Sequence, residues 1–264
     1  MPENATGNER INAITSVFRI VLIIGILFGL LILNVSCSKH VTLNLEYQVD
    51  LSQLGNKSTE QIMSEVFDVI TSRVSDYHFI LGAGTSYSSG SNIIYVHLYG
   101  ITDVDSANKL ITTRGWIDFR EMVYDSYGNP VLDANGNYTW QPAKGVINCQ
   151  AEQLTGQYVK DVTVVIDQHS DTAAIVIDFN TEEAILLEQI TKRLFVSTNP
   201  RLDKSLGVFL DGQLISSLKV NAVVSDECRI SGLSLEEARN LKSWLKSGPL
   251  PVPVNLVSST LSDD

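Results

Sequence analysis

The alternation of apolar and polar residues predicts a strand followed by a helix near the start of the water-facing part of the chain. Residues 40–49, HVTLNLEYQV, alternate as a half-buried strand does, and residues 57–74 change to helical spacing. Ser58 and Gln61 form a capping-box pattern at the start of that helix. One face of the predicted helix is apolar and is formed by Ile62, Val66, Ile70 and Val74.

The following segment extends this pattern to six elements. Residues 77–100 read as two strands around a Gly/Ser turn, and a short helix begins after Thr102. Residues 115–124, GWIDFREMVY, read as a further strand. The predicted order is therefore β-α-β-β-α-β, which is the order of a ferredoxin-like split βαβ unit.

The middle of the chain has a different character. Residues 125–145 are rich in Gly, Asn and Asp, and Asn135-Gly136 is a hairpin signal. Strands are predicted at 161–167 and 173–179, followed by a helix over 180–194. This composition predicts a separate small α+β lobe.

The last part contains a hairpin and a clearly delimited helix. Asp211-Gly212 predicts the turn of the hairpin. The helix over 234–248 begins with a Ser234–Glu237 capping box and ends at Gly248. Three prolines follow within five residues and alternate with aliphatic side chains, which suits an edge strand or an exit from the sheet: Pro249, Pro251 and Pro253.

The N-terminal region contains the strongest single-segment signal, a nearly uninterrupted apolar stretch at 17–36. Its length approaches the roughly 20 residues that cross a bilayer. Arg10 precedes this stretch and Arg19 lies near its start. Because positive charge favours the cytoplasmic side, we predict a cytoplasmic tail at 1–16 and an extracytoplasmic remainder. We therefore predict one transmembrane helix that acts as an uncleaved anchor in the cell membrane and contacts lipid.

Two other interpretations of this segment remain open. A cleaved signal peptide has a shorter apolar region and a small-residue cleavage site. The sequence NVSC at 34–37 also resembles a lipoprotein processing site, although Asn34 stands where an aliphatic residue is expected.

Composition limits the partners. The chain has 264 residues and a formal net charge of −11, which argues against nucleic acid and against docking on anionic lipid through a basic face. Cys37, Cys149 and Cys228 are too few and too scattered for a disulfide framework. Separate thiols are the favoured interpretation, and a Cys149–Cys228 bridge stays an open alternative.

Candidate chemistry is sparse, and we predict no catalytic, cofactor-binding or metal-binding residues. The histidines are scattered without metal-ligand spacing. Residues 81–90 lack the Lys and the helix of a phosphate loop. A calcium loop beginning at 133 is excluded by Tyr138 at the Gly position and Lys144 at the twelfth. The sequence thus predicts a protein that is not an enzyme and needs no cofactor.

Several segments together resemble one family. They follow in that family's order and cover roughly residues 40–257: VHLYGITDVDSA (96–107), GWIDFREM (115–122), LTG (154–156), IDFNTEEAILLEQIT (177–191), VFLDGQLISS (208–217), RISGLSLEEARNL (229–241) and LKSGPLPVPV (245–254). The chain is similar to SecD, chiefly to the first periplasmic domain of that family.

The resemblance implies an α+β fold with a ferredoxin-like base and an inserted mobile head. It implies base segments at 38–123 and 205–257, a head lobe at 124–204, and a lead-in at 258–264 to a second membrane helix. SecD acts with SecF and the SecYEG channel and uses the proton gradient to draw unfolded preprotein across the membrane. The alternative is an anchored extracytoplasmic structural or assembly protein that reuses the domain without transport.

The chain also departs from the family. The Asp-Leu-x-Gly-Gly motif after the first span is missing, and Leu218 stands where proline is usual. The later membrane helices and their proton-linked Asp and Arg residues are absent, so a truncated, a split and a divergent SecD all remain open. A moving head needs hinges, which we expect near 125–136 and at 197–207, where Gly, Asn, Asp and Pro gather.

Overall fold

The computed structural model describes most of the chain after residue 40. The described ranges are 41–76, 82–88, 90–166, 172–196 and 204–263. The predicted membrane helix at 17–36 lies outside them, and no helix within these ranges has the length and apolar character needed to span a bilayer.

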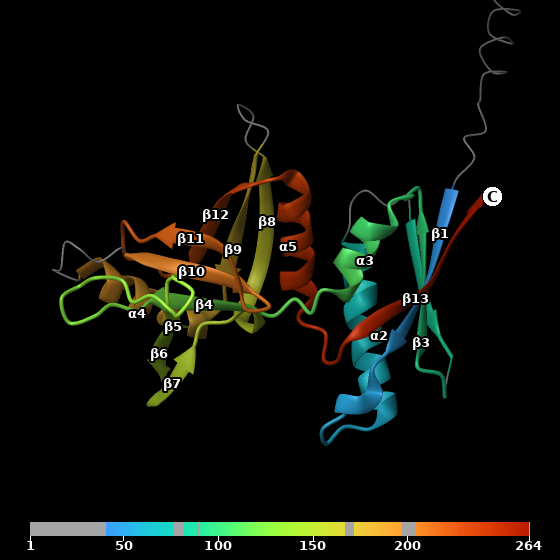
Figure 1. Cartoon of the computed structure of the whole chain (residues 1–264), viewed down its shortest axis with the longest axis horizontal. Helices are drawn as coiled ribbons and strands as arrows, with labels where there is room; N and C mark the ends of the chain where they lie inside the picture. The colour runs from blue at the N-terminus through green and yellow to red at the C-terminus, as the bar shows by residue number, and fades with distance from the viewer. Residues whose placement is uncertain (1–40, 77–81, 89, 167–171, 197–203, 264) are drawn as a thin grey trace, which may run out of the picture. The chain divides into compact units, whose positions relative to one another are not determined.

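One four-stranded antiparallel sheet joins the two ends of the described chain (Figure 1). Its strand order is β13-β1-β3-β2, the order of a ferredoxin-like sheet when β13 is taken as the fourth strand. We call this unit, with its two helices, the ferredoxin-like lobe. Its elements are β1 (Val41–Val49), η1 (Leu51–Gln53), α2 (Thr59–Ser75), β2 (Gly82–Tyr87), β3 (Ile93–Tyr99), α3 (Val104–Thr112) and β13 (Val254–Asp263).

The predicted patterns explain how this lobe forms. Alternate residues of β1 point into its core and are fully buried. The apolar stripe of α2 packs on the same core, and the Ser58–Gln61 capping box is confirmed, with each side chain bonded to the other residue's backbone. The core combines β1, β3 and both helices through residues such as Leu43, Leu45, Tyr47, Val66, Ile70, Val96 and Ile111.

The prediction that residues 115–124 complete the ferredoxin-like order is wrong. These residues form β4 (Ile117–Met122), which pairs with β10 and β5 in another sheet, and β13 is the last element of the ferredoxin-like order. The physical reason is burial. Five of the six β4 residues are buried, on both faces of the strand. A strand of the ferredoxin-like sheet has only one covered face, as β1 and β3 show.

The remaining elements form a second unit, the central lobe, with three sheets. Their strand orders are β11-β10-β4-β5, β12-β9-β8 and β6-β7. Besides β4, the elements are β5 (Trp140–Pro142), β6 (Lys144–Ile147), β7 (Gln150–Gln153), η2 (Gly156–Tyr158), β8 (Val159–Ile166), β9 (Ala173–Phe179), α4 (Thr181–Val196), β10 (Ser205–Leu210), β11 (Gln213–Lys219), β12 (Glu227–Leu233) and α5 (Leu235–Ser247).

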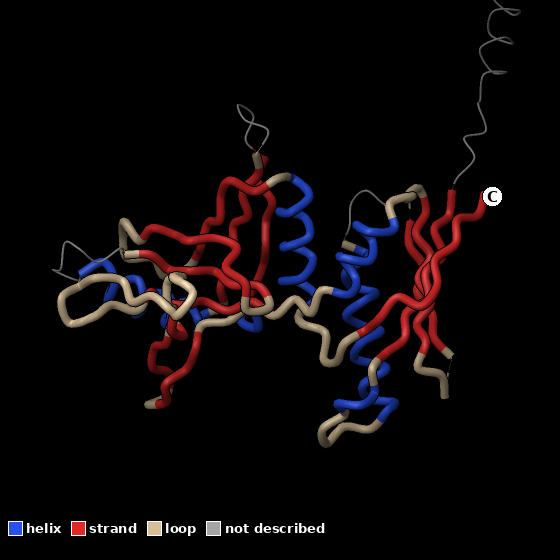
Figure 2. Tube along the Cα trace, viewed as in Figure 1, coloured by secondary structure: helices blue, strands red, loops and turns tan. Residues whose placement is uncertain are grey.

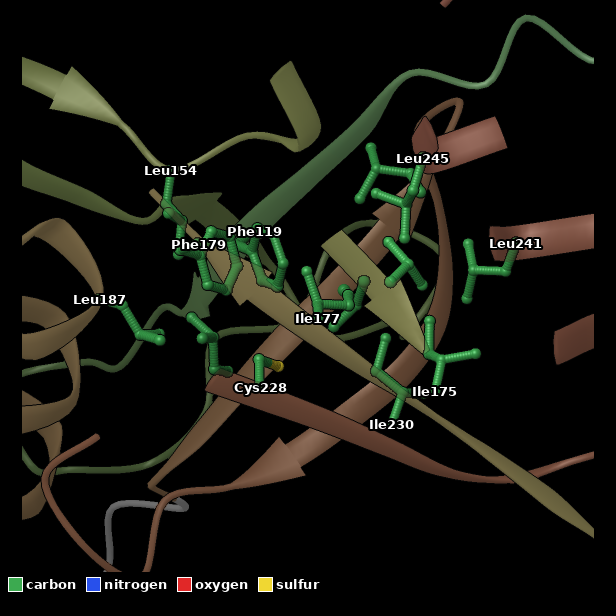
Figure 3. Packing of buried hydrophobic residues seen from close by; sticks show 14 of the residues in the cluster. Phe119, Leu154, Ile175, Ile177, Phe179, Leu187, Cys228, Ile230, Leu241 and Leu245 are labelled. Carbon is green, nitrogen blue, oxygen red and sulfur yellow. The ribbon is translucent and has the colours of Figure 1, made fainter. Parts of the chain in front are cut away.

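The central lobe has its own core, which shares no residue with that of the ferredoxin-like lobe. Figure 3 shows Phe119 of β4 beside Phe179 of β9, whose ring centroids are 5.8 Å apart. Leu187 of α4 and Leu241 of α5 pack onto the same cluster from different helices. The segment GWIDFREM at 115–122, one of those that resemble the family, is therefore explained in part by packing, because its Phe119 is fully buried.

The end of α5 follows the sequence prediction. The capping box of Ser234 and Glu237 is confirmed, and Gly248 ends the helix with a φ of 74°. The proline-rich segment leads into β13, which forms an edge of the sheet and, among the described strands, pairs with β1 alone. Residues 258–263, predicted as a lead-in to a membrane helix, form the last part of β13.

Four turns show how local chemistry shapes the central lobe. The hairpin at Asp211-Gly212 is confirmed, with both residues at positive φ. A second hairpin between β6 and β7, turning at Asn148-Cys149 with φ of 49° and 63°, was not predicted. The long loop between β4 and β5, tan in Figure 2, contains two similar turns in which Asp125 and Asp133 each accept two backbone hydrogen bonds.

The cysteines do not pair within the described residues. Cys149 is exposed at its hairpin, whereas Cys228 is buried in the central core, and both are free thiols. Burial raises the pKa of the Cys228 thiol to about 12, so this side chain behaves as an apolar core residue.

Candidate functional site

The described histidine does not form a metal site. His97 Nδ1 lies 2.6 Å from Asn44 Oδ1 across two neighbouring strands, so the pair belongs to the sheet. Across the described ranges, no group of three or more His, Cys, Asp or Glu side chains is arranged to hold a metal ion. His40, His78 and His169 lie outside those ranges.

The most unusual polar site lies where the two lobes are joined. Residues 113–116 connect α3 to β4, and residues 248–253 connect α5 to β13. The two connections run side by side, since the Leu250 N–H donates to the Arg114 carbonyl at 2.8 Å. Any movement of one lobe relative to the other must pass through these segments.

Arg73 is fully buried at this junction and bonds to both connections. Its guanidinium donates to the carbonyls of Ile111 at 2.9 Å, Arg114 at 2.9 Å and Gly248 at 3.3 Å. It also donates to the carbonyls of Leu110 and Thr113 and to the Ser247 hydroxyl. One planar five-donor group thus satisfies acceptors from α3, both connections and α5.

Burial and charge act in opposite directions on this guanidinium. Desolvation lowers the pKa of Arg73 to about 10, and the negative charge of Asp211 works against that decrease. Arg73 is therefore protonated at neutral pH and needs its carbonyl acceptors, because a buried charge without partners is costly.

Asp211 and Trp244 complete the junction from the central lobe. The Asp211 carboxylate accepts from the N–H groups of Trp116 at 2.8 Å and Gly115 at 3.2 Å. Trp244 Nε1 donates to the Leu110 carbonyl at 2.9 Å. Gly115 has a φ of 81°, and a Cβ there would lie 2.8 Å from Arg73 Nη2, so both backbone conformation and space require glycine.

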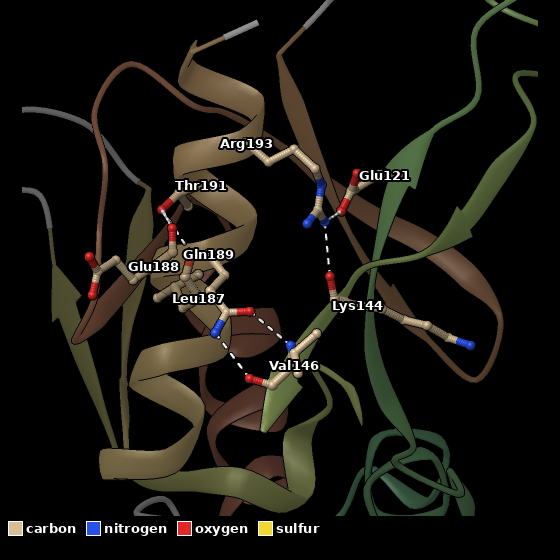
Figure 4. A network of polar contacts seen from close by, with 8 residues as sticks. All are labelled: Glu121, Lys144, Val146, Leu187, Glu188, Gln189, Thr191 and Arg193. Carbon is tan, nitrogen blue, oxygen red and sulfur yellow. Dashed lines mark hydrogen bonds and ion pairs between the residues drawn. The ribbon is translucent and has the colours of Figure 1, made fainter. Parts of the chain in front are cut away.

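The second polar network links α4 to the short strand β6 (Figure 4). The Gln189 amide accepts from the Val146 N–H at 2.8 Å and donates to the Val146 carbonyl at 3.0 Å. One turn later, Arg193 donates to the Lys144 carbonyl at 2.9 Å and forms an ion pair with Glu121 of β4. Helix side chains thus satisfy three backbone groups along one edge of β6.

A cavity of about 480 Å³ lies between α3 and the start of α5. Its lining is largely apolar, with Ile101, Leu110 and Leu235 among the contributors. Ser106 of α3 donates to Glu236 of α5 at 3.3 Å beside it. The cavity is large enough for a few apolar side chains.

The predicted hinge segments do not join the lobes in the described residues. Residues 125–136 form turns within the central lobe, and their backbone is held by Asp125 and Asp133. Residues 197–203 of the other candidate lie outside the described ranges. Sequence reasoning missed Arg73, although its position three residues after Ile70 places it on the apolar face of α2.

Comparison with known proteins finds similarity to SecD and SecDF proteins. Residues 135–252 match the family model for the SecDF P1 head subdomain, a range that includes the described elements of the central lobe from β5 to α5 and most of the connection that follows α5. The protein translocase subunit SecD of Dehalococcoides mccartyi is 29% identical over 239 residues, which cover 87% of this chain and 49% of that protein. The resemblance to SecD is confirmed.

Two further similarities extend the SecD likeness. The protein translocase subunit SecDF of Thermus thermophilus is 28% identical over 66% of this chain and 25% of that protein. A solved structure of SecDF, described as a membrane component that enhances protein export, has the same fold with a TM-score of 0.55. It is 21% identical and covers 81% of this chain and 98% of that one. The chain spans about half the length of the SecD of Dehalococcoides mccartyi.

Proposed function

We propose that this chain is an accessory subunit of preprotein translocation that binds and moves preprotein on the extracytoplasmic side of the cell membrane. The observation that carries the proposal is the match of residues 135–252 to the SecDF P1 head subdomain, within a similarity to SecD proteins over most of the chain. The fold agrees with a SecDF structure whose description includes enhanced protein export.

The two lobes supply a physical basis for a mechanical role. We infer that the ferredoxin-like lobe is the base and the central lobe is the head. The sequence analysis placed the boundaries of the head between residues 123 and 124 and between residues 204 and 205. We now infer boundaries at the connections 113–116 and 248–253, because separate cores lie on either side of those connections. In this proposal the Arg73 junction is where the head moves against the base.

The proposed partners are SecF, the SecYEG channel and unfolded preprotein. In the same proposal, one helix at 17–36 anchors the chain in the membrane with its N-terminus in the cytoplasm. A Thermus relative named SecDF supports an association with SecF. In this proposal the residues of this chain bind and move preprotein, and dependence on the proton gradient is a property of the whole translocase. The proposed function is not enzymatic.

The test is export in cells that lack this chain. We expect a pulse-labelled secreted reporter to mature more slowly in such cells, with normal rates restored by the full chain expressed with its partner subunits. An uncoupler should remove the difference between the two strains if the effect depends on the proton gradient. Equal maturation rates with and without the chain would contradict the proposal.

The alternative is an anchored structural or assembly protein that reuses the fold. Co-purification separates the two roles, because a translocation subunit should be recovered with SecF and the SecYEG channel from gently solubilised membranes. Recovery with envelope assembly proteins, and absence from the channel, would favour the alternative.

A further inference from the structure

We propose that helix α5 separates from the ferredoxin-like lobe along one polar row of side chains, beginning at its N-terminal end, and that the buried Asn240 keeps this contact weak. The polar row is formed by Glu236, Asn240, Ser243 and Ser247. The inference rests on the proposed function and deepens it, since it names the surface at which the head leaves the base. Asn240 is thereby a positioning residue for the movement of the head.

The two faces of α5 differ in character. Ala238, Leu241 and Leu245 lie on the face that packs into the central core, and the last two are labelled in Figure 3. The residues of the polar row recur at intervals of three and four, so they share a different face of the helix. Ser243 Oγ donates to the carbonyl of Arg73 in α2 at 3.1 Å, so this face meets the ferredoxin-like lobe. Apolar packing thus holds α5 in its own lobe, whereas polar contacts join it to the other.

Asn240 is a buried member of the polar row whose amide oxygen is not satisfied. The residue is 2% exposed, and Oδ1 has no hydrogen-bond partner among the described residues. Burying an amide oxygen without a partner costs free energy relative to leaving it in water. Separation of α5 lets water reach this oxygen, so Asn240 reduces the difference in free energy between the docked and the separated arrangement.

The acceptors of Arg73 are divided so that separation leaves its charge bonded. Its bonds to the carbonyls of Ile111 and Arg114, on its own side of the interface, are both 2.9 Å long. Its bonds to the end of α5 are longer, at 3.2 Å to the Ser247 hydroxyl and 3.3 Å to the Gly248 carbonyl. A guanidinium that releases the last two keeps acceptors in α3 and in the connection after it, so no cation is left without partners.

The N-terminal end of α5 is the end at which the lobes are least firmly joined. The cavity of about 480 Å³ lies there, and beside it the exposed Ser106 hydroxyl lies 3.3 Å from the Glu236 carboxylate. The same hydroxyl donates to Asp103 at 2.8 Å, so one proton serves two carboxylates and the contact between α3 and α5 is weak. At the other end of α5, Trp244 Nε1 donates to the Leu110 carbonyl at 2.9 Å in a buried position. The cavity end therefore opens, and the end beside the two connections is the pivot.

A weak polar contact suits a movement that must repeat. Two arrangements that are close in free energy are both populated, and a ligand or partner can shift the balance between them. An apolar residue in place of Asn240 removes the unsatisfied amide, so it should stabilise the docked arrangement and slow the movement. Stability and export should therefore change in opposite directions. A purely structural role for Asn240 predicts that both decrease together.

The first experiment measures stability and export for the full chain carrying Asn240→Leu. Leucine has a similar volume and needs no hydrogen-bond partner, so the melting temperature in lipid nanodiscs should rise by about 2–4 °C. In cells whose export depends on the chain, maturation of a secreted reporter should slow by at least about threefold. The control is Asn221→Leu, at an exposed position of the central lobe, which should change neither quantity. A lower melting temperature, or a higher one with an unchanged export rate, overturns the proposal.

The second experiment measures the separation directly. Genetically encoded nitroxide residues replace Glu60 of α2 and Glu188 of α4, which are both exposed, and pulsed electron–electron resonance gives the distribution of distances between the lobes. We expect two populations in the parent chain and a separated population that is at least about threefold smaller in Asn240→Leu. Asn221→Leu should keep the parent distribution. A single narrow distance in the parent chain, or the same distribution in Asn240→Leu, overturns the proposal.

A crosslinking arm does not depend on how the Asn240 variant folds. Ser106→Cys and Glu236→Cys place two thiols across the cavity end of the interface, in a chain that also carries Cys37→Ser and Cys149→Ser. A cleavable bismaleimide linker that joins the thiols should remove the separated population and slow export in spheroplasts by at least about threefold, and cleavage should restore both. Unchanged distances or unchanged export after joining overturns the proposal.

The outcomes separate this inference from the proposed function. If export depends on the chain but the distances respond neither to Asn240→Leu nor to the linker, the separating surface is wrong and the proposed function stands. If the distances respond as expected but export is equal with and without the chain, the proposed function is wrong and the separating surface stands.

Discussion

The two lobes are stabilised in different ways. The ferredoxin-like lobe contains one sheet of long strands, with two helices packed on its core. The central lobe divides its strands among three sheets, and β5, β6 and β7 have only three or four residues each. Long strands complete their hydrogen bonds with each other, whereas the short strand β6 relies on side chains of α4.

This difference shows where each lobe can adapt to a partner. In the ferredoxin-like lobe, β1 and β3 are paired on both edges, so rearrangement there would break backbone ladders. In the central lobe, side chains of α4 bond to the outer edge of β6, so a change there would exchange side-chain hydrogen bonds and leave the backbone ladder with β7 intact. The Arg73 junction belongs to neither lobe alone, because one guanidinium bonds to segments of both.

The largest expected effect comes from breaking the junction. Arg73→Met leaves several buried carbonyls without a donor and should lower the free energy of unfolding by about 4 kcal/mol or more. Urea denaturation followed by tryptophan fluorescence measures the loss. Lys192→Met, at an exposed position of α4, is the control and should change stability by less than about 0.5 kcal/mol. A loss below about 1 kcal/mol for Arg73→Met would show that the junction is not stabilised in this way.

The next effect tests whether the two cores are independent. Ile70→Ala in α2 and Ile175→Ala in β9 each remove a fully buried side chain and should each cost about 2–5 kcal/mol. Hydrogen exchange should accelerate mainly in β1 and β3 for the first variant and mainly in β8 and β12 for the second, because the cores share no residue. Equal acceleration throughout both lobes would mean that they unfold as one unit.

A pair of glycines separates backbone strain from crowding at the junction. Gly115 and Gly136 have nearly equal φ values of 81° and 83°. A Cβ at Gly115 would meet Arg73 and Trp244, whereas one at Gly136 would meet nothing within 4 Å. We expect a loss of about 1 kcal/mol for Gly136→Ala and about 2–4 kcal/mol for Gly115→Ala. Equal losses in thermal denaturation would argue against a tightly packed junction.

The smallest effect is a pH dependence of the turns between β4 and β5. Backbone hydrogen bonds from Asn129 and Asn137 are the largest causes that lower the pKa of Asp125 and Asp133. A lowered folded-state pKa gives stability that is present above the unfolded pKa of about 4 and is lost as pH falls through the folded pKa. Asp133→Asn should therefore lower the urea midpoint at pH 7 and have a diminishing effect below about pH 4. A difference from the parent chain that stays constant down to pH 2.5 would contradict this origin.

Much of the fold could be predicted from local patterns. The strand β1, the helix α2 and the helix α5 with its capping box follow from side-chain periodicity, because burial within one element depends on the spacing of its own residues. The SecD likeness was also readable from ordered motifs. The pairing of strands was harder to predict than the strands themselves. The sequence analysis assigned β4 to the wrong sheet, because the apolar pattern of a strand does not indicate which strand pairs with it.

The candidate sites were not predictable in the same way. Arg73 follows the apolar stripe of α2 in the sequence, but the sequence does not indicate that it is buried, and its acceptors lie on segments about 40 and 175 residues away. Gln189 gave no signal at all, since a glutamine at its position in α4 suits any partly exposed helix face.

The amino-acid sequence by itself determined the elements, their caps and turns, and the similarity to SecD, since each of these depends on neighbouring residues or on the order of motifs. Only the tertiary structure decided that β13 completes the first sheet, that Arg73 joins both connections and that Gln189 occupies the edge of β6. The physical reason is that hydrogen bonds between distant segments depend on where the backbone places donors and acceptors, and side-chain periodicity carries no information about that placement.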